Sequence, residues 1–212
     1  MTAIAPRVLV VDDDESICWV LSKALDKAGF AVTVAHSGPE ALERLALEPP
    51  SIVLMDIRMP GMSGLDALEK IRSERRDVQV IIMTAQSTMT HAIEAMKRGA
   101  YDYVTKPFDT DQVTALVARA AGEAGLPPPA EETAEKSEVT PIVGRSAQMQ
   151  EVFKAIGRVA GKDVTVLLRG ESGTGKELVA QVIHANSRRL SGPFVTVNAA
   201  ASGPAYGGQG GP

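Results

Sequence analysis

The sequence predicts an α/β fold built on a five-stranded, doubly wound parallel sheet. Short runs of consecutive apolar residues, such as residues 52–55, are typical of strands that are buried on both faces. Between these runs lie segments whose apolar residues recur at helical spacing, as in residues 17–28. Strand and helix alternate five times within residues 5–121, which favours parallel strands joined by helices on both faces of one sheet.

Each expected strand is followed by a helix with recognisable ends. Gly29 and Gly99 are placed to stop the first and the fourth of these helices. Ser37 and Glu40 form a capping box at the start of the second, and Asp109 begins the fifth. The strands are expected at residues 8–11, 31–35, 52–56, 78–83 and 101–104.

Polar side chains stand where four of these strands end. Asp12 and Asp13 follow the first strand, Asp56 ends the third, Thr84 follows the fourth and Lys106 lies just beyond the fifth. Because the carboxyl ends of parallel strands meet at one rim of the sheet, we expect these five side chains to lie close together. That rim is where open α/β sheets bind ligands.

The chemistry of this cluster follows from its charges. Two carboxylates about 4 Å apart repel each other by roughly 4 kcal/mol at an effective dielectric constant near 20. A hard divalent cation, above all Mg²⁺, relieves that repulsion, and a carboxylate such as Asp56 can act as a nucleophile and carry a phosphoryl group. Lys106 and the Thr84 hydroxyl would then bind the phosphoryl oxygens. The alternative is that the aspartates cap helices and Lys106 is a solvated charge.

Composition narrows the class of protein. The chain has 212 residues and a net charge of −4, so the whole chain shows no basic footprint for nucleic acid. Its single cysteine, Cys18, excludes an intramolecular disulfide and fits a reducing compartment. The sequence shows neither a signal peptide nor an apolar stretch near 20 residues. We therefore expect a cytoplasmic protein without a membrane partner.

A second region follows a change in composition. Residues 122–139 are rich in proline and glutamate and are expected to form a solvated linker. Ser146 is placed to start a helix, and residues 164–168 and 194–197 read as strands, the first of them buried. We expect residues 140–200 to form a partial α/β unit. The glycine- and proline-rich residues 201–212 are expected to be disordered.

A glycine-rich loop lies between the first strand and the following helix of this second region. Its Gly-x-x-x-x-Gly-Lys spacing is that of a Walker A loop, in which backbone N–H groups cradle phosphates and the lysine reaches the outer ones. Glu177 stands where Ser or Thr usually binds Mg²⁺, and a plain glycine-rich turn is the alternative. The residues expected to contact ATP are Gly170, Glu171, Ser172, Gly173, Thr174, Gly175, Lys176 and Glu177.

Four segments resemble the receiver domain of two-component response regulators, which has a flavodoxin/CheY-like fold. They are Val-Val-Asp12-Asp13-Asp14, Asp56-Ile-Arg-Met-Pro-Gly, Met-Thr84-Ala85 and Thr-Lys106-Pro107-Phe108.

This resemblance implies roles for single residues. Asp56 would take a phosphoryl group from a sensor histidine kinase. Asp13 would bind Mg²⁺ directly, with help from Asp12 and the main-chain carbonyl of Arg58. Thr84 and Tyr103 look like the family's switch pair, in which the aromatic ring follows the hydroxyl. The alternative for Tyr103 is an ordinary aromatic at the edge of the core.

The second region resembles another family. Its Gly-Glu-Ser-Gly-Thr-Gly-Lys-Glu loop is similar to that of AAA+ activators of sigma-54 RNA polymerase, in which Glu at the position of Glu177 is usual. A receiver joined to this loop resembles the NtrC subgroup of response regulators. After Asn198 the resemblance stops, so we expect a truncated chain that binds ATP weakly at most and does not hydrolyse it. Contacts with sigma-54 polymerase and DNA would belong to the full-length relative.

Three functions compete on this evidence. The first is a response regulator of transcription, whose receiver switches on phosphorylation, forms a homodimer and controls a sigma-54-dependent AAA+ domain. In that case residues 87–98 would form the face used for a dimer or domain contact. The second is a stand-alone phosphoacceptor and interaction module without output, which is not an enzyme. The third is a P-loop ATPase with a regulatory domain.

Overall fold

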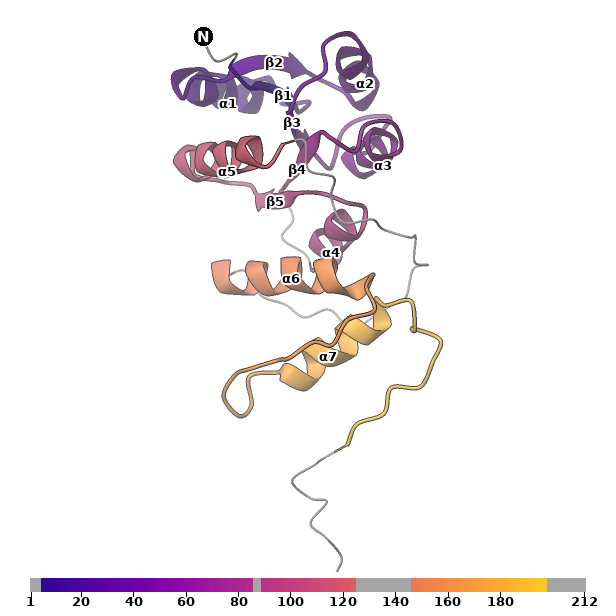
Figure 1. Cartoon of the computed structure of the whole chain (residues 1–212). Coiled ribbons are helices and arrows are strands. Elements are labelled where there is room, and N and C mark those ends of the chain that lie inside the picture. The colour runs from indigo at the N-terminus through magenta and orange to yellow at the C-terminus, as the bar shows by residue number, and fades with distance from the viewer. Residues whose placement is uncertain (1–4, 86–88, 125–145, 198–212) are drawn as a thin grey trace, which may run out of the picture.

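The computed structural model describes residues 5–85, 89–124 and 146–197. The first two ranges form a five-stranded sheet with helices on both faces, as Figure 1 shows. The strand order is β2-β1-β3-β4-β5, and every pair is parallel, which confirms the predicted fold class. The strands are β1 Arg7–Val11, β2 Ala31–Ala35, β3 Ile52–Asp56, β4 Gln79–Thr84 and β5 Asp102–Thr105, and the helices are α1 Glu15–Lys27, α2 Gly38–Leu47, α3 Gly64–Glu74, α4 Met89–Lys97, α5 Thr110–Gly122, α6 Ala147–Ala160 and α7 Lys176–Ala185.

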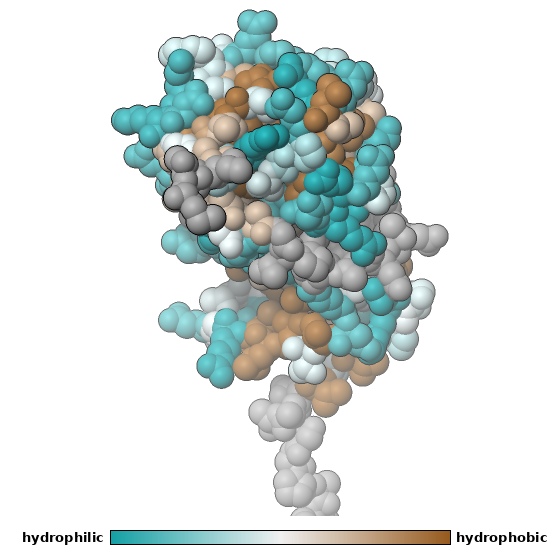
Figure 2. All heavy atoms as spheres, turned by 45° about the horizontal axis from the view of Figure 1, so that its top comes forward, coloured by the Kyte–Doolittle hydropathy of each residue, from teal (hydrophilic) through white to brown (hydrophobic). Residues whose placement is uncertain are grey.

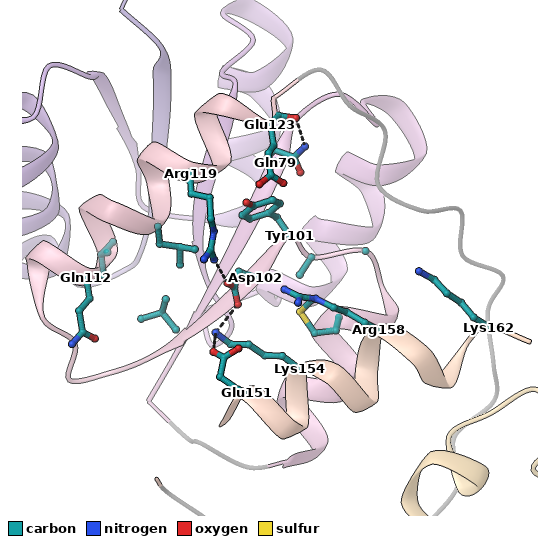
Figure 3. A pocket seen from close by; sticks show the side chains of 16 residues that line it. Gln79, Tyr101, Asp102, Gln112, Arg119, Glu123, Glu151, Lys154, Arg158 and Lys162 are labelled. Atoms are coloured by element: carbon teal, nitrogen blue, oxygen red, sulfur yellow. Dashed lines mark hydrogen bonds and ion pairs between the residues drawn. The ribbon is translucent and has the colours of Figure 1, made fainter. Parts of the chain in front are cut away.

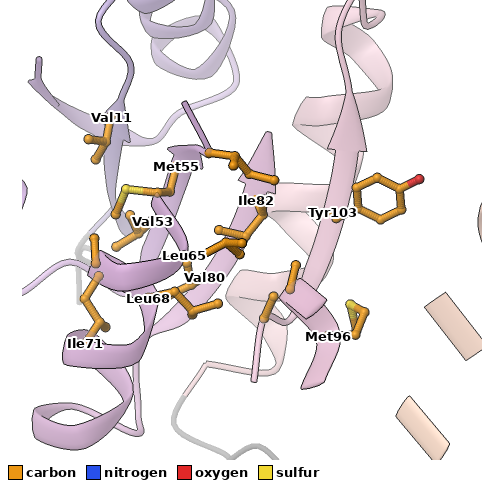
Figure 4. Close-up of a cluster of buried hydrophobic side chains, with 14 of the residues drawn as sticks. Val11, Val53, Met55, Leu65, Leu68, Ile71, Val80, Ile82, Met96 and Tyr103 are labelled. Atoms are coloured by element: carbon orange, nitrogen blue, oxygen red, sulfur yellow. The ribbon is translucent and has the colours of Figure 1, made fainter. Parts of the chain in front are cut away.

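The pleat of the strands divides the core into two layers. In β3, Val53 and Met55 face one cluster of buried side chains, which helices α2, α3 and α4 complete (Figure 4). Ile52 and Leu54 face the opposite cluster, which α1 and α5 complete. All four side chains are fully buried, as the uninterrupted apolar run predicts for a strand between two helical layers.

The strand order creates a crevice at one rim of the sheet. The chain leaves β1 toward β2 on one side, whereas β3 lies on the other side of β1. At such a switch point the loops after the two central strands separate and leave room for a ligand. Val11 of β1 lies opposite Met55 of β3, so Asp12 and Asp56 follow at the same level. The fold alone therefore brings two carboxylates to one crevice.

Local capping fixes where the helices begin. The Asp14 side chain accepts a hydrogen bond from Ser16 N and caps α1. Ser37 caps α2 by accepting from Glu40 N. The Glu40 carboxylate accepts from His36 N at 2.7 Å, one residue before the position that a capping box predicts. These caps hold the loops that carry Asp12 and the end of β2.

The second region has the two predicted helices but not the two predicted strands. Residues 164–168 and 194–197 have no regular secondary structure, and they belong to no sheet in the described part of the chain. Instead of being buried, Leu167 is 73% exposed and Val195 is 73% exposed. A strand needs a neighbour for its hydrogen bonds, and residues 146–197 contain none. Figure 2 shows apolar side chains gathered on the surface below the first domain.

Several expectations fall outside the described residues. Most of the expected linker, the segment before Ser146 and the glycine-rich residues 201–212 lie there, so the predicted domain boundaries stay predictions. Helix α5 runs to Gly122 and therefore takes in the first residue assigned to the linker. None of the described helices has the length and apolar character needed to cross a membrane.

The first testable prediction concerns Gly64, where α3 begins directly against β3. Gly64 N donates to Ile57 O at 2.8 Å, and a Cβ on Gly64 would lie 1.9 Å from Asp56 O. Because backbone atoms cannot yield cheaply, we expect Gly64→Ala to lower the free energy of unfolding by about 1–3 kcal/mol, measured by urea denaturation. Gly122→Ala is the control, since nothing lies within 4 Å of its added Cβ. Equal denaturation midpoints for the two variants would contradict the prediction.

Candidate functional site

One lysine ammonium lies between two buried carboxylates at the rim of the sheet. Lys106 Nζ is 2.5 Å from Asp12 Oδ2 and 2.6 Å from Asp56 Oδ1. The exposed fractions of the three side chains are 16%, 1% and 7% in that order. The second oxygen of Asp56 accepts a hydrogen bond from Arg58 N at 2.6 Å. Both oxygens of Asp56 are thus held by a donor, and the carboxylate has one fixed orientation.

Backbone hydrogen bonds carry each of these side chains to the rim. Lys106 N donates to Thr84 O at 2.7 Å and ties the end of β5 to the end of β4. Ile57 N donates to Met83 O at 3.0 Å, and Asp12 N donates to Ala35 O at 3.2 Å. The structure therefore places Asp12, Asp56, Thr84 and Lys106 at neighbouring strand ends, as the sequence predicts.

Burial and neighbouring charges shift the pKa values of Asp12 and Lys106. Burial raises the pKa of the Asp12 carboxyl, although the hydrogen bond from Lys106 opposes the shift. Burial would lower the pKa of the Lys106 ammonium, but hydrogen bonds to Asp12 and Asp56 and their negative charges raise it above its usual value. The ammonium is therefore firmly charged, and one positive group faces two carboxyl groups at the rim.

The donor set fits a divalent cation. Asp12, Asp56 and the Arg58 carbonyl offer only hard oxygen ligands, the kind that Mg²⁺ prefers, and Asp13, the residue after Asp12, is exposed. Within the described ranges no group of three or more Asp, Glu, His or Cys side chains is already arranged to hold a metal ion. The Lys106 ammonium instead contacts the two buried carboxylates. A cation would add the positive charge that the trio lacks.

Two residues near Asp12 have a structural role that no sequence motif predicts. Cys18 Sγ donates to the Asp12 main-chain oxygen at 3.3 Å, and His36 Nδ1 lies 3.3 Å from the same atom. Burial raises the pKa of the Cys18 thiol to about 11, so it stays a neutral donor. Both residues hold the loop after β1. Their positions, 18 residues apart, carry no pattern that predicts this contact.

Tyr103 projects sideways from β5, as Figure 4 shows, and Lys154 of α6 lies over its ring. Its side chain is 2% exposed, and its hydroxyl is buried without a hydrogen-bond partner among the described residues. Burial raises the pKa of this phenol. Lys154 Nζ of α6 lies 5.5 Å from the centroid of the ring and 2.7 Å from Asp102 Oδ1 (Figure 3). Neither Lys154 nor Asp102 stood out in the sequence.

The predicted phosphate loop leads directly into α7, which begins at Lys176. Gly173 and Gly175 have φ angles of +80° and +84°, a backbone conformation that suits glycine. Lys176 Nζ donates to Gly170 O at 3.0 Å and also to Glu171 O, so the lysine folds back over its own loop. Every residue from Gly170 to Glu177 is exposed except Lys176, which is half-buried.

A parallel sheet of order β2-β1-β3-β4-β5 with two acidic residues and one lysine at its rim is the arrangement expected of a receiver domain. The family model for the response regulator receiver domain matches residues 8–118, more than half of the 212 residues, and the chain therefore belongs to the response regulators. The model for the sigma-54 interaction domain matches residues 142–206.

Among curated proteins the chain is similar to the transcriptional regulator NtrC. It is 46% identical over 194 residues to NtrC of Escherichia coli and 39% identical over 199 residues to NtrC of Azospirillum brasilense. These matches cover 92% and 93% of the chain, but only 41% of each relative. The regulatory protein AtoC of Escherichia coli is 42% identical over 205 residues, 95% of this chain and 44% of AtoC.

Solved structures agree with this assignment. NtrX from Brucella abortus, crystallised in complex with ATP, is 32% identical with a TM-score of 0.55, and the match covers 95% of this chain and 45% of NtrX. The receiver domain of a Francisella response regulator is also 32% identical, with a TM-score of 0.54. This match covers 56% of this chain and 98% of the Francisella domain. The chain is thus an NtrC-like response regulator with a receiver and part of a sigma-54 interaction domain.

The second testable prediction concerns the charge balance at the rim. In Lys106→Met the burial of Asp12 remains while the hydrogen bond and charge that lower its pKa disappear, so we expect that pKa to rise further. A carboxyl whose folded pKa is raised contributes stability below its unfolded pKa, and this contribution is lost as the pH rises through the folded pKa. The variant should therefore lose about 1–3 kcal/mol of unfolding free energy at neutral pH.

Urea denaturation between about pH 4 and pH 7 checks this prediction, because the unfolded carboxyl titrates near the lower limit. We expect the stability of Lys106→Met, relative to the wild type, to fall as the pH rises across this range. Lys70→Met is the control, since Lys70 is exposed on α3. The stability of Lys70→Met relative to the wild type should be the same at about pH 4 and at about pH 7. The same result for Lys106→Met would contradict the account of the rim.

Proposed function

We propose that Asp56 accepts a phosphoryl group from a sensor histidine kinase and that the resulting change in the receiver controls the sigma-54 interaction region. One observation carries this proposal. The Asp56 carboxylate is nearly buried at the end of a central strand, and it is held by the Lys106 ammonium and by Arg58 N. A carboxylate fixed in this way at a ligand-binding rim is suited to act as a nucleophile.

In this proposal one Asp56 oxygen forms a bond to the phosphorus of the donor. The bond between phosphorus and the imidazole nitrogen of the kinase histidine breaks, and that nitrogen keeps the electron pair. Lys106 is in place to bind an oxygen of the transferred group, because its ammonium already contacts Asp56. Mg²⁺, held by Asp12, Asp13, Asp56 and the Arg58 carbonyl, would neutralise negative charge on the phosphoryl oxygens.

Phosphorylation would then change the contacts of Lys106 and Thr84. A phosphoryl group adds about 1.5 to 2 negative charges and strong acceptor oxygens to the rim. Lys106 would give up its contact with Asp12 for these oxygens, and the Thr84 hydroxyl would donate to them. Thr84 and Lys106 are joined by a backbone hydrogen bond of 2.7 Å, so movement at one strand end reaches the other. Tyr103, in β5, is the proposed second member of this switch.

A nucleotide site at residues 170–177 is a second candidate function. The left-handed glycines and the helix that begins at Lys176 support it, and NtrX was crystallised with ATP. We propose weak ATP binding by Gly170, Glu171, Ser172, Gly173, Thr174, Gly175, Lys176 and Glu177, because Lys176 must first leave the carbonyls it now binds. We expect no hydrolysis by residues 1–212. ATP bound equally well by Lys176→Ala would contradict this site.

Partners outside the receiver are proposed from what the relatives are. The chain matches about two fifths of the length of NtrC, so control of transcription with sigma-54 polymerase and DNA is proposed for the longer protein. We also propose a cytoplasmic protein that forms a homodimer through its receiver when phosphorylated. The stand-alone phosphoacceptor is less favoured, because α6 and α7 place part of a sigma-54 interaction domain on the same chain.

The third testable prediction is the site of phosphorylation. After incubation with Mg²⁺ and acetyl phosphate, mass spectrometry should find one phosphoryl group per chain, located on Asp56. Asp56→Asn should take up none, whereas Asp66→Asn should behave as the wild type because Asp66 is an exposed carboxylate on α3. An adduct on another residue, or no adduct in the wild type, would contradict the proposed function.

A further inference from the structure

The main-chain carbonyl of Asp12 is held by two side chains from distant parts of the chain. Cys18 of α1 donates its thiol hydrogen to this oxygen at 3.3 Å, and His36, which follows β2, places Nδ1 at 3.3 Å from it. The two donor atoms lie 4.0 Å apart and share this one acceptor. A carbonyl oxygen only accepts hydrogen bonds, so His36 Nδ1 carries the proton at this contact. The proposed phosphoryl transfer uses neither side chain.

Each of these donors is fixed by its own surroundings. Cys18 is 3% exposed and belongs to the buried cluster that α1 and α5 complete. The His36 side chain is exposed, but its main-chain nitrogen donates to Glu40 Oε2 at 2.7 Å. The other Glu40 oxygen accepts hydrogen bonds from the Arg44 guanidinium at 2.9 and 3.1 Å. The two donors are thus held by α1 and α2 and do not depend on the loop that they fix.

The direction of this carbonyl decides the direction of the next peptide group. The peptide bond between Asp12 and Asp13 is planar and trans, so the Asp13 N–H points opposite to the Asp12 carbonyl. Asp12 N donates to Ala35 O at the end of β2, so both polar main-chain atoms of Asp12 face the β2 side of β1. The Asp13 N–H therefore faces the other side, where β3 and Asp56 lie.

The Asp13 side chain has no contact of its own that would orient it. Its carboxylate is exposed and has no hydrogen-bond or ion-pair partner within residues 5–85, 89–124 and 146–197. By contrast, the Asp12 carboxylate binds Lys106 Nζ and Asp14 N. The direction in which the Asp13 carboxylate reaches is therefore set by the peptide group before it.

A ligand that is already in position binds a cation more tightly than one that must be ordered first. Fixing the backbone of a residue costs conformational entropy, and a site that is fixed beforehand avoids this cost when the ion binds. Groups that orient a ligand without touching the ion change metal affinity by about tenfold or more in many proteins. Cys18 and His36 hold a main-chain atom next to the ligand, and each can partly replace the other. The loss of either one should therefore have a smaller effect.

We propose that Cys18 and His36 are positioning residues of the cation site, which direct Asp13 toward the rim and thereby raise the affinity of the rim for Mg²⁺. The inference deepens the proposed function and rests on it, because it takes Asp13 as a ligand of Mg²⁺. Neither side chain has to touch the ion or the phosphoryl group, since both act through the peptide bond between Asp12 and Asp13.

Calorimetry of Mg²⁺ binding to residues 1–212, without a phosphodonor, tests the role of Cys18. Cys18→Ala removes the donor, and we expect its dissociation constant to be about threefold higher than that of the wild type. Cys18→Ser keeps a hydrogen-bond donor and should restore the affinity. Ser22→Ala is the control on the same helix, because the buried Ser22 hydroxyl has no partner among the described residues. Equal Mg²⁺ affinity in Cys18→Ala and Cys18→Ser would overturn the role of Cys18.

His36 allows the same test without a change in the core, because its side chain is exposed. His36→Ala removes the ring and should also raise the dissociation constant about threefold. His36→Asn keeps an N–H donor near the position of Nδ1 and should restore the affinity. Equal Mg²⁺ affinity in these two variants would overturn the role of His36.

A double-mutant cycle tests whether the effect passes through Asp13. Asp13→Asn keeps an oxygen ligand but loses its charge, so its weaker binding can be measured at higher Mg²⁺ concentrations. In this background the further change Cys18→Ala should weaken Mg²⁺ binding no more, because the direction of an uncharged ligand matters little. Another loss of about threefold in the double variant would show that Cys18 acts by a different route, and would overturn the proposal.

Phosphoryl uptake from acetyl phosphate separates this inference from the proposed function. Cys18→Ala should need about threefold more Mg²⁺ for its half-maximal rate, yet reach the rate of the wild type at saturating Mg²⁺. A lower rate at saturation would overturn a role confined to binding the cation.

The two proposals can fail separately. Uptake on Asp56 in the wild type, with equal Mg²⁺ affinities in all these variants, would overturn the positioning role and leave the proposed function standing. No uptake in the wild type, with the expected differences in Mg²⁺ affinity, would overturn the proposed function and leave the positioning role standing.

Discussion

The site depends on one ammonium shared by two carboxylates that come from different strands. Asp12 and Asp56 are nearly buried, and Lys106 contacts both of them at 2.5 and 2.6 Å. Two carboxylates at one rim repel each other, and the ammonium between them offsets this repulsion. The ammonium compensates only part of their charge, which leaves the rim able to attract a cation. Under the proposed function the same ammonium would also bind the phosphoryl group on Asp56, so stability and function would rest on one contact.

This contact follows from the topology of the sheet. In the order β2-β1-β3-β4-β5, the ends of β1 and β3 lie at the switch point, and the end of β5 reaches them through its link to β4. A receiver also has to report what happens at its rim. Strand β5 is suited to this, because Lys106 follows it and its own residues Asp102 and Tyr103 contact α6. The site and the second region are thus connected by a single strand.

The sequence was sufficient for those features that depend on local pattern. Apolar runs locate the strands, and their carboxyl ends locate Asp56 and Lys106, because parallel strands leave little freedom at the rim. It was not sufficient for contacts between distant segments. Lys154 and Tyr103 are brought together only by the way α6 packs, which no periodicity records. The expected strands at 164–168 and 194–197 were wrong, because an apolar run forms a strand only when a neighbour supplies hydrogen bonds.

The most direct test of the account is Mg²⁺ binding, measured by calorimetry in the absence of any phosphodonor. The account holds that the buried carboxylates are short of positive charge, so the wild type should bind one Mg²⁺ ion. Asp12→Asn and Asp56→Asn should each weaken this binding by about tenfold or more, since each removes a charged ligand. Binding of the same affinity in both variants and the wild type would show that the ion is held elsewhere and would contradict the central claim.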